Sequence, residues 1–325
     1  MKVAIVIDKP RVDYLPSEEG EQEDSQSLKT MKDIKKALSG EYEVIHLEMD
    51  SDIIDRLREE KVDLVFNLCN GINGEASLSQ LPSMLEFANI PYTGSGPLGH
   101  GLAFNKIVAG NMFKEANIET PAFIYISDID EIDERKFKYP VLVKPKDEGS
   151  SRGIHDDSLI FDRKFLIKKL EETLELYNPP MMIMEYIEGR EFTVGVIEEE
   201  DGLRVLPILE IDLSGLPKGI NKIYSFEAKV KYDDYVEYHC PARLDEETRL
   251  KIEGTAKSAF KSLGLRDYAR VDMRLLKGVP YVIEINSLPG LDKDHSDICK
   301  MVEAMNLDYK DLVKRIVKQA SKRMD

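Results

Sequence analysis

Short apolar runs alternate with amphipathic segments over the first third of the chain. Three runs have the length of buried strands, at residues 2–8, 42–47 and 62–68. Two segments between them repeat their apolar residues at helical spacing, at residues 27–38 and 52–60. Strands that alternate with helices predict right-handed βαβ units around a parallel sheet. The polar, acidic stretch 11–24 predicts a long surface loop.

The pattern changes in the middle of the chain, where strands become frequent. Helices are predicted at residues 78–88, 105–116 and 164–176, and strands at 141–144, 181–187 and 191–197. The last third predicts a strand, a long loop, a helix, a hairpin and a closing helix, at residues 205–211, 212–238, 246–263, 268–286 and 308–321. The whole pattern predicts an α/β protein, with domain boundaries near residues 95 and 190.

The charge balance limits the partners of the chain. Its 325 residues carry a formal net charge of −16, which repels nucleic-acid phosphates, so a nucleic-acid partner is not expected. The apolar run at the N-terminus is too short for a signal peptide, and no stretch approaches the roughly 20 apolar residues of a membrane span. We therefore expect a soluble, cytoplasmic protein that does not interact with membranes.

Cysteine and histidine spacing indicates neither a disulfide framework nor a zinc site. The three cysteines are widely spaced and form no C-x-x-C pair. His239 lies in a strand just before Pro241 and is interpreted as structural. Neither His239 nor His295 has a partner at zinc-ligand spacing.

One glycine-rich segment matches a nucleotide-binding pattern but lacks its context. Gly94, Gly96 and Gly99 satisfy G-x-G-x-x-G, yet Pro97 lies inside the pattern and the first strand of the chain is far away. We interpret this segment as a turn before a helix. The pattern G-x-x-x-x-G-K-[ST] does not occur, which excludes a P-loop nucleotide fold.

A second glycine-rich segment, at residues 149–153, follows an apolar strand that ends at Lys144. Its backbone N–H groups can form a nest around phosphate oxygens, and the Lys144 ammonium can reach the same oxygens as a point charge. A solvated Gly/Ser loop is the common alternative, and the segment alone does not decide between the two.

Two strand-like runs near the C-terminus carry polar residues at alternate positions. Arg270 and Asp272 share one face of the first run, and Glu284 and Asn286 share one face of the second. A three-residue turn with Gly278 in the left-handed conformation would oppose the two carboxylates and pair Arg270 with Asn286. Opposed carboxylates repel, so a cation between them is expected, and oxygen ligands of this kind suit magnesium. A one-residue slip of the strands would instead place the carboxylates on opposite faces in water. The residues of the hairpin alone favour neither the metal site nor the slipped pairing.

A series of motifs extends from about Asn67 to the C-terminus. In chain order they include IPYTGSG, VKPKDEGSSRGI, YIEGREFTVGV, HCPA, ARVDMRL and EINSLPGL. Their order and spacing resemble those of the D-alanine–D-alanine ligase family of ATP-grasp enzymes. The resemblance implies an ATP-grasp fold with an N-terminal parallel βαβ, Rossmann-like domain at 1–95. Two α+β ATP-grasp subdomains would follow at 96–190 and 191–325.

The resemblance also implies how ATP and magnesium are held. Lys106 and Lys144 resemble the lysines that hold the ATP phosphates, and Glu191 resembles the ribose-binding glutamate. The hinge strand that contacts the adenine would comprise Glu185, Tyr186 and Ile187. The lid over the phosphates would contain Ser150 and Ser151. The ligands of magnesium, or of manganese in its place, would be Asp272, Glu284 and Asn286.

Further positions of the family pattern concern the reaction itself. Arg270 resembles the arginine that stabilises the tetrahedral intermediate, and Lys229 resembles the lysine of a mobile catalytic loop. Gly290 and Ser296 resemble partners of the second amino acid.

The chain departs from the family pattern in three places, all of which concern the first amino acid. The first strand ends in Asp8-Lys9-Pro10, where the family has a glycine-rich exit followed by a serine and a glutamate. Asn70 replaces a histidine, and Val230 replaces a tyrosine. Glu75 or the acidic stretch 18–24 could hold the ammonium group of the first amino acid instead. The identity of that substrate therefore stays open.

An enzyme of this family activates a carboxylate as an acyl phosphate and couples it to an amine. The resemblance implies ligation of two D-alanines for peptidoglycan synthesis, with ATP and magnesium as cofactors and small amino acids as substrates. A homodimer is one oligomeric option. One alternative is another ATP-grasp ligase with a different amino acid. The other is a degenerate ATP-binding sensor or scaffold, which the intact set of charged residues on the hairpin disfavours.

Overall fold

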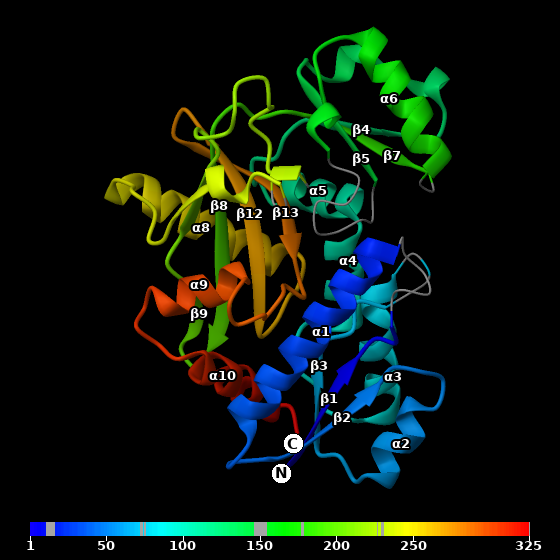
Figure 1. The fold of residues 1–325 in the computed structure, drawn as a ribbon, viewed down its shortest axis with the longest axis vertical. Coiled ribbons are helices and arrows are strands. Elements are labelled where there is room, and N and C mark those ends of the chain that lie inside the picture. The colour runs from blue at the N-terminus through cyan, green and yellow to red at the C-terminus, as the bar shows by residue number, and fades with distance from the viewer. Residues whose placement is uncertain are drawn as a thin grey trace.

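The computed structural model describes residues 1–10, 17–71, 74, 76–145, 155–176, 179–225, 227–228 and 231–324. This part of the chain contains three sheets with helices beside them (Figure 1). The sheets of the N-terminal and middle regions lie at opposite ends of the long axis, and the largest sheet lies alongside them (Figure 1).

The N-terminal sheet is parallel, with the strand order β2-β1-β3. Its strands are β1 (Lys2–Ile7), β2 (Glu43–Glu48) and β3 (Leu64–Asn67). The helices around it are α1 (Ser17–Leu38), α2 (Ile53–Glu59) and α3 (Gln80–Ala88). Side chains of β1 pack against α1 on one face and against α2 and α3 on the other, which is why this strand is a continuous apolar run. The predicted parallel βαβ arrangement is confirmed.

Helix α1 begins at Ser17, although the sequence predicted a loop through residue 24. That prediction is wrong for residues 17–24, and residues 11–16 lie outside the described part of the chain. The stretch 17–24 consists mainly of glutamate and glutamine, which have high helix propensity. It lacks apolar residues, so a criterion based on hydrophobic periodicity could not detect the helix.

The middle sheet is antiparallel, with the strand order β4-β7-β5-β6. Its elements are β4 (Phe123–Ile126), β5 (Val141–Pro145), β6 (Leu159–Ile160), α6 (Arg163–Leu176) and β7 (Met181–Glu185). Helix α6 and this sheet share a core of their own, to which Val141, Val143, Leu166 and Leu170 contribute. Strand β7 ends at Glu185, two residues earlier than predicted.

The largest sheet is antiparallel, in the order β11-β10-β8-β12-β13, with β9 paired to β8. Its strands are β8 (Arg190–Glu199), β9 (Gly202–Val205), β10 (Leu209–Asp212), β11 (Glu237–His239), β12 (Tyr268–Leu276) and β13 (Val279–Asn286). The helices near it are α4 (Pro97–Phe104), α5 (Lys106–Glu115), α8 (Glu246–Ser262), α9 (Asp297–Glu303) and α10 (Tyr309–Ser321). Helices α5 and α8 pack on one face of β8 and β12.

Three details of this region differ from or extend the prediction. The strand predicted at 205–211 is two strands, because Pro207 lies between β9 and β10 and cannot donate to a ladder. The predicted loop 212–238 gives way to β11 at Glu237. Helix α9 was not predicted, since seven residues are too few for a clear helical period.

The glycine-rich segment at Gly94, Gly96 and Gly99 was predicted to be a turn before a helix. Helix α4 begins at Pro97, inside this segment, which confirms that prediction.

The hydrophobic cores do not follow the order of the sheets. Residues of β1, β3 and α1 pack in one cluster with residues of β10, α9 and α10. The domain boundaries at 95 and 190 stay a prediction. Among the described residues, no helix combines the length and the apolar character that a membrane crossing requires.

Candidate functional site

The predicted pairing of polar residues on the β12–β13 hairpin is confirmed. Asp272 lies opposite Glu284, and Arg270 lies opposite Asn286. The prediction of a three-residue turn is wrong, because the observed hairpin reaches this register in another way. Strand pairing continues to Leu276 and Val279, so the turn has two residues between paired positions. A register shift between Asp272 and Met273 then moves the polar pairs into place.

The turn has the backbone conformation that a tight hairpin needs. Lys277 and Gly278 have φ values of 50° and 77°, which match a two-residue turn with two left-handed residues. The sequence correctly indicated left-handed Gly278 but not left-handed Lys277. The later register shift is a β-bulge, a feature that often redirects side chains near a functional site.

Asp272 accepts hydrogen bonds from three neighbouring side chains. Arg270 donates to both of its carboxylate oxygens, from Nε and a terminal nitrogen, each at 2.9 Å. Asn286 Nδ2 also donates to Asp272, at 2.9 Å, and Thr193 Oγ1 donates at 2.5 Å. Burial alone would lower the pKa of Arg270, but the charge and hydrogen bonds of Asp272 outweigh it and raise that pKa above its ordinary value. Arg270 therefore stays a cation.

Glu284 faces two lysines that come from different parts of the chain. Its Oε2 lies 3.9 Å from Nζ of Lys106, at the start of α5, and 3.7 Å from Nζ of Lys144, on β5. The Lys144 side chain is 3% exposed, and burial lowers its pKa to about 8, with Glu284 opposing the shift and Lys106 adding to it. The lysine predicted from the apolar strand is thus brought to the carboxylate hairpin.

Positively and negatively charged groups alternate at this site. Arg270 lies 3.6 Å from Asp297 as well as against Asp272, and Lys300 lies 3.4 Å from Asp297, so among the described residues several cations face three carboxylates within a small, half-buried region. Such a set can bind a phosphate chain through the lysines and a hard divalent cation through the carboxylate and amide oxygens. The structure brings together the described residues predicted for phosphate and metal with the arginine predicted for the tetrahedral intermediate: Lys106, Lys144, Asp272, Glu284, Asn286 and Arg270.

The residues predicted for the nucleoside lie where β7 leads into β8. The Glu185 carboxylate accepts the backbone N–H of Lys138 at 2.7 Å, so it fixes the adjacent loop. The Tyr186 hydroxyl donates to the carbonyl oxygen of Lys222 at 2.7 Å. Ile187 is buried, and Glu191 begins the polar face of β8. This segment therefore borders the same sheet face as the hairpin site.

Arg274, which is 6% exposed on β12, was not predicted as a site residue from the sequence. Arg274 is the direct cross-strand partner of Glu191 and forms an ion pair with its carboxylate. The available signal was alternation, because Arg270, Asp272 and Arg274 are spaced two residues apart and therefore share a face.

The two residues predicted for the second amino acid are neighbours. A Cβ atom at Gly290 would lie 3.1 Å from Ser296 Oγ, so the glycine leaves room for the serine hydroxyl. The first amino acid is predicted to bind near the end of β1. There the carboxylate of Asp8 accepts hydrogen bonds from the backbone N–H groups of Asn70 at 2.8 Å and Gly71 at 3.0 Å. Asn70 itself is exposed.

Several predicted residues lie outside the described part of the chain: Glu75, Ser150, Ser151, Lys229 and Val230. Their proposed roles stay predictions.

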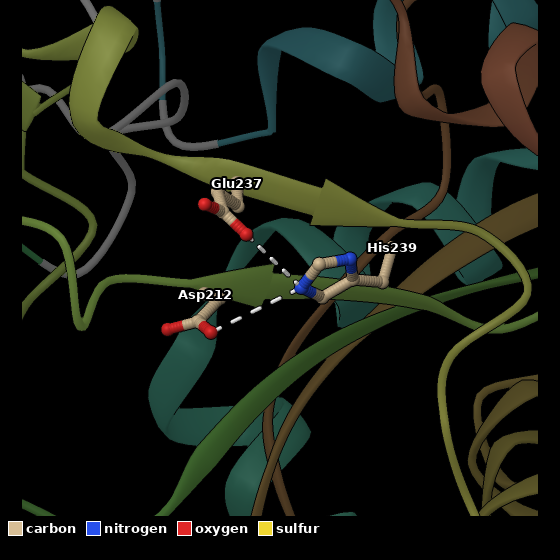
Figure 2. A group of neighbouring side chains, drawn as sticks. All are labelled: Asp212, Glu237 and His239. Atoms are coloured by element: carbon tan, nitrogen blue, oxygen red, sulfur yellow. Dashed lines mark ion pairs between the residues drawn. The ribbon is translucent and has the colours of Figure 1, made fainter.

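A separate group of potential metal ligands lies at the other edge of the sheet. Asp212, Glu237 and His239 place their ligand atoms within 4.8 Å of one another (Figure 2). His239 Nε2 lies 3.9 Å from Asp212 and 3.6 Å from Glu237, which is an ion-pair geometry. Sequence spacing gave no hint of it, since Asp212 is distant along the chain. A cavity of about 360 Å³ beside α8, lined by Pro207 and Pro241 among others, contains no predicted site residue.

Comparison with known proteins gives a consistent result. A family model described as the D-ala D-ala ligase C-terminus matches residues 112–318. A D-alanine–D-alanine ligase of Fervidobacterium nodosum is 34% identical over 316 residues, which cover 92% of this chain and 95% of the relative. A D-alanine–D-alanine ligase of a Marinomonas species is 35% identical over 288 residues, 86% of each chain.

Solved structures show the same fold. A D-alanine–D-alanine ligase from Bacillus anthracis superimposes with a TM-score of 0.79 at 24% identity, covering 100% of this chain and 98% of the other. The VanG D-Ala:D-Ser ligase from Enterococcus faecalis has a TM-score of 0.75 at 22% identity, with 98% and 99% covered. The predicted α/β, ATP-grasp fold is confirmed.

Proposed function

Because the chain belongs to the D-alanine–D-alanine ligase family, we propose that it joins two molecules of D-alanine at the site on the β12–β13 hairpin. Its family makes it an ATP-dependent ligase that acts on small molecules. The observation that carries the proposal is the meeting of Lys106 and Lys144 with Glu284, opposite the Arg270–Asp272 pair. Binding of ATP alone would use the lysines and the magnesium ligands, whereas Arg270 adds a cation suited to the oxyanion of an acyl-transfer step.

The donor set fits a magnesium ion. Asp272 and Glu284 offer carboxylate oxygens and Asn286 offers an amide oxygen, which are the hard ligands that magnesium prefers. The lysines and Arg270 are already paired with carboxylates, so the phosphates of ATP would add negative charge to a site whose described cations are in use. Magnesium bound there would supply positive charge to the transferring phosphoryl group. Manganese would suit the same ligands.

The residues of the chain have separate tasks in the proposed reaction. Lys106 and Lys144 bind and orient the ATP phosphates, so that the γ-phosphoryl group passes to the carboxylate of the first amino acid. The product is an acyl phosphate, and ADP leaves. The amine of the second amino acid attacks the acyl carbon, Arg270 stabilises the oxyanion that develops, and inorganic phosphate departs. Gly290 and Ser296 bind the second amino acid.

A specific observation supports a second candidate, a ligase for a different first amino acid. Asp8 occupies the strand exit and uses both carboxylate oxygens on backbone N–H groups of Asn70 and Gly71. It therefore organises the loop that follows β3. The ammonium group of the first amino acid would need another acidic partner, for which Glu75 stays our proposal.

A phosphate-release assay across D- and L-amino acids, alone and in pairs, tests the function. With ATP and magnesium we expect the fastest release with D-alanine alone, and a dipeptide of D-alanine by mass spectrometry. Faster release with another first amino acid would favour the second candidate. Absence of ATP-dependent release with every pair would favour a sensor or scaffold. A homodimer and a cytoplasmic location stay predictions, the former open to light scattering.

A further inference from the structure

Arg274 ties together three segments at the nucleoside end of the proposed ATP site. Its guanidinium forms an ion pair with the Glu191 carboxylate on β8. It also donates to the carbonyl oxygen of Ile187 at 3.2 Å and to that of Lys222 at 3.2 Å. Its central carbon lies 4.5 Å from the centre of the Tyr186 ring. One buried cation therefore fixes the hinge, the loop at Lys222 and the carboxylate relative to each other.

The Glu191 carboxylate is oriented but not enclosed. Its side chain is 19% exposed, whereas that of Arg274 is 8% exposed. A carboxylate has about four lone-pair sites, so the contact with Arg274 leaves capacity for hydroxyl donors from a ligand. A buried arginine is also costly without its partner, which makes the pair a stable support for a third group.

The same sheet contains a matched pair on its other face. Arg190 precedes Glu191 on β8, so their side chains point to opposite faces. Arg190 donates to both oxygens of Glu210 at 2.6 and 2.7 Å, and to the carbonyl of Arg243 at 2.9 Å. It lies 5.1 Å from the Phe192 ring. The two arginines thus make alike contacts, but only Arg274 faces the proposed ATP site.

We propose that Arg274 is a positioning residue for nucleotide recognition: it holds Glu191 toward the ribose hydroxyls and locks Tyr186 and Ile187 as the wall of the nucleoside site. This inference rests on the proposed function, because it assumes that ATP binds along this face. It adds a residue that makes selection for a ribonucleotide depend on an ion pair between β8 and β12. Loss of Arg274 should therefore weaken the recognition of the ribose hydroxyls more than the binding of the phosphates.

Equilibrium binding to the full chain tests the inference without requiring turnover. Calorimetry would give dissociation constants for ATP, 2′-deoxy-ATP and 3′-deoxy-ATP with wild type and with Arg274→Met, Arg274→Lys, Glu191→Gln and Arg190→Met. We expect wild type to prefer ATP over at least one deoxynucleotide by about tenfold or more, the value of a hydrogen bond to a charged group. Arg274→Met and Glu191→Gln should both reduce this preference to about twofold or less. Arg274→Lys should keep part of it, and Arg190→Met should keep all of it.

The outcomes separate this inference from the proposed function. If Arg274→Met weakens binding of ATP and both deoxynucleotides equally, Arg274 is only structural and the inference fails while the function stands. The same holds if wild type shows no preference, or if Arg190→Met loses the preference as completely as Arg274→Met. If wild type binds no ATP, both proposals fail. Should Arg274→Met not fold, the inference requires Arg274→Lys to bind ATP with a reduced preference, and an unchanged preference in that variant overturns it.

Discussion

Two pairs of opposed carboxylates lie at the two edges of the largest sheet, and they differ in what neutralises them. Asp272 and Glu284 face each other across β12 and β13, with side chains 23% and 25% exposed. Asp212 and Glu237 face each other across β10 and β11, with side chains 35% and 75% exposed. The first pair is half-buried, whereas the second is partly exposed at Asp212 and mostly exposed at Glu237.

The neighbours of each pair decide its use. The Asp272–Glu284 pair meets cations from α5 and β5 as well as Arg270 of its own strand, whereas the Asp212–Glu237 pair meets His239 of its own strand. Water screens the second pair, so carboxylates can stay opposed there at little cost. Opposition alone therefore does not indicate a site. Opposition with burial and with cations delivered from distant segments does.

Removing one carboxylate from each pair should give the largest difference. Glu284→Gln should lower ATP-dependent phosphate release on the order of 10²–10³-fold, because it removes a proposed magnesium ligand that faces both lysines. Glu237→Gln, the matched change at the other edge, should leave release within about twofold, as expected for an exposed group. Circular dichroism would verify that both variants fold. If both variants lose phosphate release to the same extent, the two pairs of carboxylates do not differ in function as we infer.

A buried histidine gives a prediction for acid stability. His100, on α4, is fully buried and shares a hydrogen bond of 2.8 Å with Ser287. Burial, with a smaller effect of Arg266, lowers its pKa to about 4 from the ordinary 6.5. Between these values the unfolded chain binds more protons than the folded chain, so falling pH favours unfolding. His100 should therefore cost about 3 kcal/mol of folding free energy between pH 6.5 and 4.

Urea titrations at several pH values would measure this effect. Relative to wild type, His100→Asn should flatten the decline in unfolding free energy over that pH window, whatever its effect at neutral pH. Parallel curves for wild type and His100→Asn would contradict the prediction.

Lysine substitutions sharpen the role of the delivered cations. Lys144→Ala should weaken ATP binding by about tenfold to a hundredfold, since a charge-assisted contact to phosphate is lost. Lys169→Ala is the control, because Lys169 belongs to the same middle region but pairs with Asp157 at 2.6 Å. Calorimetry with ATP would compare the two. Unchanged affinity in Lys144→Ala would remove the lysine from the phosphate site.

The smallest effect is expected at the β10–β11 edge of the sheet. His239→Asn should change the unfolding free energy by about 1 kcal/mol or less, because the two carboxylates that it pairs with are partly or largely exposed. Added zinc should not raise the melting temperature of wild type relative to this variant. If zinc raises the melting temperature of wild type but not of His239→Asn, then Asp212, Glu237 and His239 bind metal. Both pairs of carboxylates would then belong to cation sites.

Sequence reasoning succeeded where one local rule governs the structure. The strand Lys2–Ile7 was evident because burial on both faces requires continuous apolar residues. The register of Asp272 and Glu284 was correct, although the predicted turn was one residue too long and the bulge was not foreseen. These two errors cancelled in the pairing, so a correct contact did not mean a correct backbone.

The rest depended on partners that are distant in sequence. The pairing of Arg274 with Glu191 joins residues 83 positions apart, and no local pattern contains it. The approach of Lys144 to Glu284 depends on how the middle and largest sheets are placed, and only the family resemblance suggested it. The start of α1 at Ser17 was not predicted, because its first residues are polar helix formers and show no hydrophobic periodicity.

The core shared by the first and last parts of the chain has a consequence for how the protein loses structure. Residues of β1 and α1 complete the same apolar cluster as α9 and α10, whereas the middle sheet and α6 have a cluster of their own. A cut near residue 95 would divide this core, so we expect the two ends of the chain to melt as one cooperative unit. The middle sheet meets the rest of the molecule through a smaller cluster with Ile107 and Ile283, so we expect it to open at a lower free energy. Lys144 belongs to that sheet and Glu284 to the larger unit, so the charge cluster is where local opening would first separate ATP-binding groups.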